Sequence, residues 1–224
     1  MNRFDCSRVV AFSGGCFSGK TTTMKAVKEA LIERNYKVEM LDELLRTEVD
    51  DKFKSIDQIR KNPVEYFELQ KRIITKKIEQ EKFAFSNKDT NTVFLVDRAI
   101  SDSLFYLENY VDKTNLPDCI IDSYCKFHEQ VRKYAHEAFK NYSVIAEFMP
   151  LNNANDAGVF RPKSINILKQ YEYSVIHMLN RFYAYTNRPF NNTRYYTYDL
   201  NEMSINKVTE HIINALHLQR YENY

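Results

Sequence analysis

The chain has 224 residues, of which 44% are hydrophobic and 28% charged, and its formal net charge is +2. These values suit one globular domain that buries a core. The charge is too small to argue by itself for a nucleic-acid-binding surface. No apolar run approaches the roughly 18 residues of a membrane span.

The cysteines and the N-terminal sequence indicate in which cellular compartment we expect the protein. Four cysteines are present, and their spacing matches neither a metal site nor a disulfide framework: Cys6, Cys16, Cys119 and Cys125. The N-terminus lacks the apolar stretch of a signal peptide. We therefore expect a reducing, cytoplasmic compartment and no association with a membrane.

The first predicted element is a buried strand over residues 9–12, where four apolar residues follow one another. Residues 14–21 have the sequence Gly-Gly-Cys-Phe-Ser-Gly-Lys-Thr, which matches the phosphate-binding P-loop pattern G-x-x-x-x-G-K-[ST]. A helix is predicted over residues 22–35. A strand before the loop and a helix after it place backbone N–H groups against a phosphate chain.

The glycine content supports this P-loop. The chain has four glycines, where average usage would give about sixteen, and three of the four lie in this loop. We expect Lys20 to reach the β- and γ-phosphates of a nucleotide and Thr21 to offer its hydroxyl to Mg²⁺. The predicted nucleotide-binding residues are Gly14, Gly15, Cys16, Phe17, Ser18, Gly19, Lys20, Thr21 and Thr22.

The second predicted strand covers residues 36–41 and ends at two carboxylates, Asp42 and Glu43. Glu43 and Arg46 are three residues apart, so a helix would present both on one face. We expect Glu43 to orient or deprotonate an acceptor hydroxyl, a role for which Asp42 competes. Arg46 would bind the acceptor or a phosphate. An ordinary intrahelical ion pair is the alternative for Glu43 and Arg46.

A long helix is predicted from Pro63 to about residue 85, because proline suits the first helical turn and apolar residues recur at helical spacing. Two basic pairs on this helix, Lys71-Arg72 and Lys76-Lys77, are predicted to form a solvated face.

The third predicted strand, over residues 92–96, ends in Asp97 and Arg98. A carboxylate directly after a core strand is placed to hold Mg²⁺, directly or through water. Arg98 would stabilise charge on the phosphates or on the acceptor. The alternative is a helix cap followed by a surface arginine.

The rest of the chain continues the alternation of helices and strands. Helices are predicted over residues 101–111, 117–140, 163–186 and 205–218, and strands over residues 143–148 and 195–198. This alternation predicts an α/β fold, with a mostly parallel sheet covered by helices on both faces. We expect a single domain over residues 1–224. Ligands of such a sheet bind outside the carboxyl ends of its strands.

The loop over residues 152–162 is rich in asparagine and contains the fourth glycine, Gly158, close to Arg161. We expect a lid at about residues 152–163 that brings Arg161 to the transferring phosphoryl group. A solvated surface loop is the alternative.

In this order, the motifs resemble the small P-loop kinases that include thymidylate kinase, deoxynucleoside kinases and ribosylnicotinamide kinase, and in particular related phage and bacterial ATPases. The resemblance rests on residues 14–21, Glu43-x-x-Arg46, residues 67–70, Asp97-Arg98 with residues 102–104, and residues 156–161. It implies a three-layer α/β/α P-loop NTPase fold with a five-stranded parallel sheet of order 2-3-1-4-5, a helical lid, and ATP on the P-loop. The Arg-Glu-Pro run that thymidylate kinases carry after strand two is absent, which argues against thymidylate as the acceptor.

The leading hypothesis is an ATP-dependent kinase that uses Mg²⁺ and phosphorylates a nucleoside, a nucleoside monophosphate or a related small molecule. In this hypothesis the catalytic residues are Lys20, Glu43, Arg98 and Arg161, the substrate-binding residues are Glu43, Arg46, Asp97 and Arg98, and the metal-binding residues are Thr21 and Asp97. One alternative is a kinase of a hydroxymethyl-modified base in DNA, which the net charge of +2 does not favour. Another is a GTP-binding switch, which is disfavoured because residues 87–89 lack the spacer of the guanine motif Asn-Lys-x-Asp. A monomer and a homodimer are both left open.

Overall fold

The computed structural model describes residues 8–15, 18–41, 44–45, 56–151 and 194–218. Within these residues, five strands form one parallel sheet in the order β2-β3-β1-β4-β5. The strands are β1 Arg8–Gly14, β2 Lys37–Leu41, β3 Thr92–Asp97, β4 Val144–Phe148 and β5 Arg194–Tyr198. This arrangement confirms the predicted α/β class and the strand order.

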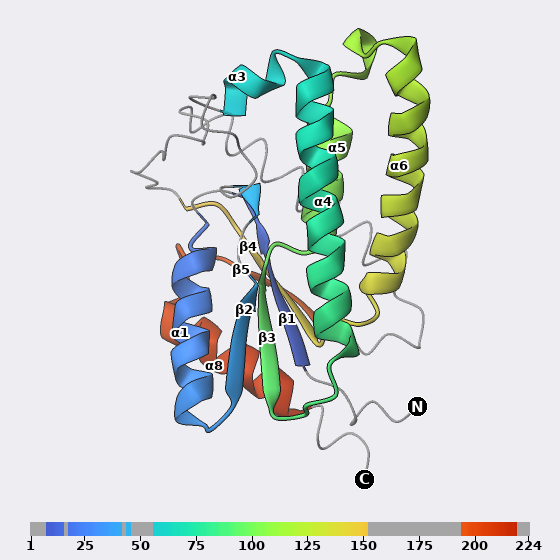
Figure 1. Ribbon diagram of the computed structural model, residues 1–224. Coiled ribbons are helices and arrows are strands. Elements are labelled where there is room, and N and C mark those ends of the chain that lie inside the picture. The colour runs from blue at the N-terminus through green and yellow to red at the C-terminus, as the bar shows by residue number, and fades with distance from the viewer. Residues whose placement is uncertain (1–7, 16–17, 42–43, 46–55, 152–193, 219–224) are drawn as a thin grey trace.

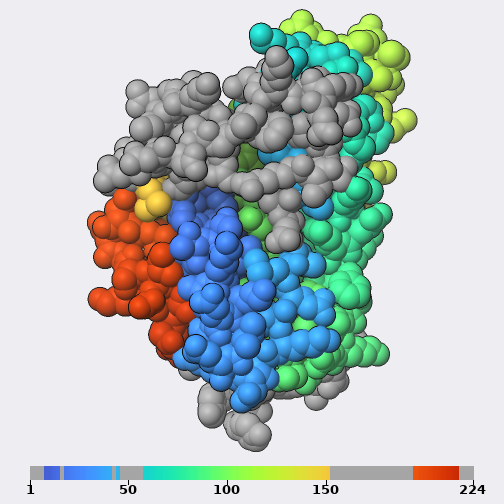
Figure 2. All heavy atoms as spheres, turned by 60° about the vertical axis from the view of Figure 1, so that its left-hand side comes forward, coloured from blue at the N-terminus to red at the C-terminus, as the bar shows by residue number. Residues whose placement is uncertain are grey.

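Helices cover both faces of the sheet, as the alternation of elements predicts. They are α1 Lys20–Glu33, α3 Ile56–Arg60, α4 Pro63–Ser86, α5 Ile100–Tyr110, α6 Asp118–Ala138 and α8 Ile205–Leu218, with a short 3-10 turn, η2, over Lys113–Asn115. Figure 1 shows α1 and α8 on one face and α4, α5 and α6 on the other. Figure 2 shows the same division from the side, with α1 and β2 in blue between α8 in orange-red and α4 in green.

The core is divided by the sheet, because successive side chains of a strand point to opposite faces. On β1, Val10 and Phe12 pack in the cluster under α1 and α8. Val9 and Ala11 pack in the cluster under α4, α5 and α6. The alternation puts Ser13, the next residue after Phe12, on the α4–α6 face, where the end of β1 meets α5.

Helix α4 begins and ends close to the predicted positions. The side chain of Asn62 caps it by accepting a hydrogen bond of 3.3 Å from the backbone N–H of Glu65, and Pro63 occupies its first turn. Asparagine is a preferred residue at this capping position, and proline needs no intrahelical partner there.

The prediction that the four basic residues of α4 form a solvated face is wrong for one of them. Lys76 and Arg72 are exposed, but Lys77 is only 3% exposed. Adjacent residues on a helix point about 100° apart, so one lysine faces water while its neighbour faces the sheet. Lys77 lies toward the end of β3 and donates to the backbone carbonyl of Asp97 at 2.8 Å.

Two predicted features fall outside the described residues. They are the lid at about residues 152–163, with Gly158 and Arg161, and the helix over residues 163–186.

Among the described helices, none combines the length and the apolar character that crossing a membrane requires. The described cysteines, Cys119 and Cys125, are free and exposed.

Candidate functional site

The P-loop begins where β1 ends, and its backbone there needs glycine. Gly14 has a φ of 119°, and a Cβ at this position would lie 2.5 Å from the carbonyl oxygen of Phe148 in β4. Gly19, which precedes α1, has a φ of 81°, and its Cβ would lie 2.4 Å from Cδ1 of Leu200. These conformations explain why glycine, which is rare elsewhere in the chain, occurs at both positions.

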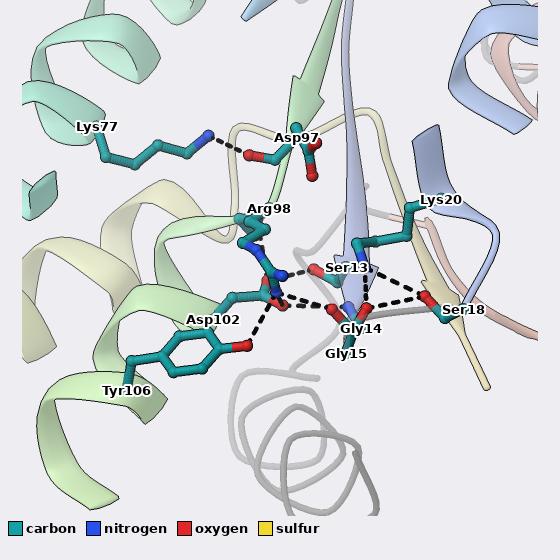
Figure 3. Close-up of polar contacts among 11 residues, drawn as sticks. Ser13, Gly14, Gly15, Ser18, Lys20, Lys77, Asp97, Arg98, Asp102 and Tyr106 are labelled. Atoms are coloured by element: carbon teal, nitrogen blue, oxygen red, sulfur yellow. Dashed lines mark hydrogen bonds and ion pairs between the residues drawn. The ribbon is translucent and has the colours of Figure 1, made fainter. Parts of the chain in front are cut away.

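Lys20 points back over the loop that precedes it (Figure 3). It is the first residue of α1, it is 7% exposed, and its Nζ donates to the carbonyl of Gly15 and, at 3.1 Å, to Oγ of Ser18. Ser18 Oγ also donates to the carbonyl of Gly15 at 3.1 Å. Three of the predicted nucleotide-binding residues therefore lie together, with the ammonium group of Lys20 hydrogen-bonded to Gly15 and Ser18. Thr21 and Thr22 follow in the first turn of α1 and are exposed, whereas Cys16 and Phe17 lie outside the described residues.

Asp97 is the last residue of β3 and is in register with Phe12 of β1. It is 8% exposed, and its buried Oδ1 has no hydrogen-bond partner within the described ranges. Figure 3 shows its carbonyl directed at Lys77 and its carboxylate pointing the other way. Leaving a buried acceptor unsatisfied costs about 1–3 kcal/mol, so this oxygen is suited to a ligand.

The donor chemistry of Asp97 and Thr21 fits Mg²⁺, which binds oxygen ligands. In the described part of the chain, no group of three or more His, Cys, Asp or Glu residues could hold a metal ion. The Mg²⁺ sites of phosphate-handling proteins usually combine one or two protein carboxylates with substrate phosphates and water.

Arg98 has a left-handed backbone conformation, with a φ of 65°. Its N–H donates to the carbonyl of Phe12 at 3.0 Å, and its Nη1 donates to the carbonyl of Gly14 at 2.9 Å and to the hydroxyl of Tyr106 at 3.1 Å. The side chain is 12% exposed. A surface arginine, the alternative derived from the sequence, is therefore wrong, because the guanidinium lies against the start of the P-loop.

Asp102 is a central residue of this site that the sequence analysis did not assign to it. It is fully buried on α5 and accepts hydrogen bonds from Oγ of Ser13 at 2.7 Å and from the backbone N–H groups of Gly14 and Ala99 at 3.1 and 3.0 Å. One carboxylate thus joins the end of β1 to the start of α5. The sequence does contain a local indication of this role, because Asp102 is the third residue of a helix that follows a strand, a position where acidic residues cap the helix.

A buried polar network lies behind Asp97 on the α4 side. Burial lowers the pKa of Lys77, and the nearby Glu81 partly offsets this. Burial also raises the pKa of Glu81 to about 7. The hydroxyl of Tyr142 donates to Oε1 of Glu81 at 2.6 Å and accepts from the N–H of Ile100 at 3.3 Å. The network therefore joins α4 and the segment before β4 to the turn that carries Asp97.

The residues predicted for the acceptor side lie outside the described residues: Asp42, Glu43, Arg46 and Arg161. The roles assigned to them from the sequence therefore stay predictions. What the structure brings together at the carboxyl edge of the sheet is the phosphate side: the described P-loop residues, Asp97 and Arg98.

Comparison with known proteins agrees with this phosphate-binding architecture. Residues 9–142, more than half of the chain, match the family model described as "AAA domain". No curated protein matches.

Two solved structures share the fold. The NadR protein in complex with NR has a TM-score of 0.60 and 16% identity, with 96% of this chain and 52% of that chain covered. The NadR protein in complex with NAD and AMP-PNP has a TM-score of 0.55 and 14% identity, with 94% of this chain and 49% of that chain covered. The chain thus spans about half the length of these proteins, and at such identities the likeness shows the fold alone. With its matched family model, P-loop and sheet order, the chain belongs to the AAA domain family and has the P-loop NTPase fold.

Proposed function

We propose that the protein is an ATP-dependent phosphotransferase that moves the γ-phosphate of ATP to a nucleoside, a nucleoside monophosphate or a related small molecule. One observation carries this proposal. Lys20 from α1, Asp97 from β3 and Arg98 from the following turn lie at the carboxyl edge of the sheet, and Lys20 and Arg98 both donate to carbonyls of the P-loop. Phosphoryl transfer depends on such positioned charges around the transferred group.

The proposed roles follow from the contacts. Lys20 and the P-loop N–H groups bind the β- and γ-phosphates, whose oxygens replace the Gly15 carbonyl and the Ser18 hydroxyl as partners of Nζ. Arg98 stabilises the charge that develops on the phosphoryl group. Thr21 and Asp97 would hold Mg²⁺, which when bound supplies positive charge to the phosphate oxygens. Glu43, Arg46 and Arg161 keep their predicted roles toward the acceptor and the phosphoryl group.

The activity is tested by measuring ADP release from ATP and Mg²⁺ with a panel of acceptors. The panel contains nucleosides, nucleoside monophosphates, nicotinamide riboside and hydroxymethyl-pyrimidine DNA. ADP release that depends on a small molecule supports the proposal, whereas release that depends only on the DNA identifies the DNA kinase. The solved structures similar to this chain contain NR, NAD and AMP-PNP, which supports including nucleosides and nucleotides in the panel.

Lys20→Ala should lower ADP release by about 10²–10³, because it removes one positioned charge from the phosphates. Lys25→Ala is the matched control, since Lys25 is exposed on the same helix. Wild-type turnover in a folded Lys20→Ala protein would contradict the proposed function.

Asp97→Asn should weaken the response of the rate to Mg²⁺ more than the binding of ATP. Asp122→Asn, on the surface of α6, is its control.

A further inference from the structure

The buried carboxylate of Asp102 does more than capping its own helix requires. A carboxylate that only capped α5 would need one of its hydrogen bonds, the bond of 3.0 Å from the backbone N–H of Ala99. Its other two bonds reach across to β1, from Oγ of Ser13 at 2.7 Å and from the N–H of Gly14 at 3.1 Å. Asp102 therefore fixes the backbone where the P-loop begins.

Both backbone polar groups of Gly14 bind side chains from the turn after β3 and the first turn of α5. Its N–H donates to Oδ1 of Asp102, and its carbonyl accepts from Nη1 of Arg98 at 2.9 Å. The same Nη1 lies 4.0 Å from Oδ1 of Asp102, and Figure 3 shows the two side chains beside the P-loop. Each of these three residues thus contacts the other two.

The ion pair between Asp102 and Arg98 is buried, because the aspartate side chain is 0% exposed and the arginine side chain 12% exposed. A charge in such surroundings is costly unless it is paired and hydrogen-bonded. The pairing therefore restricts where the guanidinium of Arg98 lies relative to the P-loop. A displacement of about 1 Å at a reacting centre can cost about 10² in rate, so this restriction matters for phosphoryl transfer.

We propose that Asp102 is a positioning residue for phosphoryl transfer, which acts through Gly14 and Arg98 to hold the guanidinium beside the phosphoryl group that the P-loop binds. The inference rests on the proposed function and adds to it a residue that touches neither ATP nor the acceptor. Its effect on the reaction therefore depends on the presence of Arg98.

The substitution Asp102→Asn changes the contacts of this residue with little change in volume. One carboxylate oxygen becomes an NH₂ group, so the N–H of either Gly14 or Ala99 then faces another donor. Asp102→Glu is the second variant, because it keeps a carboxylate but moves it along a longer side chain. Each is combined with Arg98→Ala, so that the result does not depend on the folding of one variant.

The first test is a double-mutant cycle on kcat, measured with ATP, Mg²⁺ and an acceptor at a temperature where circular dichroism shows that every variant is folded. Asp102→Asn should lower kcat by about 10², while the KM for ATP changes less than about twofold. In the Arg98→Ala background the same substitution should lower kcat less than about threefold, because the guanidinium that it positions is gone. Asp118→Asn, an exposed carboxylate in the first turn of α6, is the matched control.

Equal losses of kcat in the two backgrounds would show that Asp102 acts independently of Arg98 and would overturn the inference. A rise in the KM for ATP with unchanged kcat would overturn it as well, because it would limit Asp102 to shaping the P-loop for nucleotide binding.

The second test needs no turnover. ADP, Mg²⁺ and aluminium fluoride together mimic the phosphoryl group during transfer, and transition-state analogues report interactions that form only at that stage. By calorimetry, Asp102→Asn, Arg98→Ala and the double variant should weaken this complex by similar factors of at least tenfold. The affinity for AMP-PNP should change less than about threefold in all three. Equal weakening of both complexes would overturn the inference.

The two tests separate this inference from the proposed function. Non-additive weakening of the aluminium fluoride complex, without ADP release from any acceptor, would support the positioning role of Asp102 and contradict the phosphotransferase. ADP release by the wild type, with additive effects of the Asp102 and Arg98 substitutions, would overturn the positioning role and support the phosphotransferase.

Discussion

At the scale of single residues, Arg98 combines an unfavourable backbone conformation with a directed side chain. Its φ of 65° is in the left-handed region, which costs a residue with a Cβ roughly 1–2 kcal/mol. The hydrogen bonds of its N–H to Phe12 and of its Nη1 to Gly14 and Tyr106 hold it there. The strain therefore occurs at a residue whose charge the proposed reaction uses, as is common at functional sites.

Two substitutions of Arg98 separate its charge from its backbone conformation. Arg98→Ala and Arg98→Gly both remove the guanidinium, so kcat should fall by about 10²–10³ in both. Only glycine relieves the positive φ, so Arg98→Gly should be more stable than Arg98→Ala by about 1 kcal/mol. Steady-state kinetics and urea denaturation measure the two effects. Equal stability of the variants would show that the left-handed conformation carries no strain.

At the scale of elements, α4 supports the turn between β3 and α5 through buried polar groups. Lys77 donates to the carbonyl of Asp97, and its electrostatic partner Glu81 accepts from Tyr142, which in turn accepts from the first residue of α5. A buried pair of this kind adds little net stability, but removing one partner leaves the other uncompensated. Helix α4 therefore acts on the site by holding the backbone of Asp97.

This network predicts a non-additive pattern of stability. Lys77→Met should lower the free energy of unfolding by about 3 kcal/mol, because it leaves the Glu81 carboxyl and the Asp97 carbonyl without their cation. The double variant Lys77→Met/Glu81→Leu should recover part of this loss. Lys76→Met is the control, since this neighbouring lysine is exposed. Urea denaturation of the wild type, these three variants and the single variant Glu81→Leu gives the result. A double variant as unstable as the sum of the two single variants would rule out the pairing.

At the scale of the whole molecule, two buried glutamates connect stability to pH. Burial raises the pKa of Glu81 to about 7 and that of Glu147 to about 8, from an ordinary value of 4.5. An acid with a raised pKa keeps its proton in the folded state after the unfolded state has lost it. Its contribution is therefore fully present below pH 4.5 and is lost as the pH rises through the folded pKa.

The predicted consequence is a loss of stability between about pH 4.5 and about pH 8 that depends on Glu147. The slope due to this group is at most about 1.4 kcal/mol per pH unit. Glu147→Gln does not titrate, so the difference in unfolding free energy between this variant and the wild type should grow as the pH rises. Chemical denaturation at several pH values measures it, with Glu129→Gln as the exposed control. A constant difference would show that the Glu147 carboxyl titrates normally.

The sequence by itself determined most of the described elements and the position of the P-loop. Apolar runs and helical spacing are local properties, so the strands β1, β3 and β4 and the helix α4 begin and end near their predicted positions. The P-loop was equally visible, because glycines at Gly14 and Gly19 are a local requirement of the backbone. Parallel strands then bring their carboxyl ends to one edge, which placed Asp97 beside the loop.

Only the tertiary structure decided which polar residues turn inward. Lys76 and Lys77 look alike in the sequence, but the position of α4 against β3 buries the second and exposes the first. The burial of Glu147 and the hydrogen bonds of Asp102 to Ser13 and Gly14 depend on contacts between strands and helices far apart in the chain. A linear pattern records the chemistry of a side chain and its local spacing, while its partners and its exposure arise from packing between distant elements.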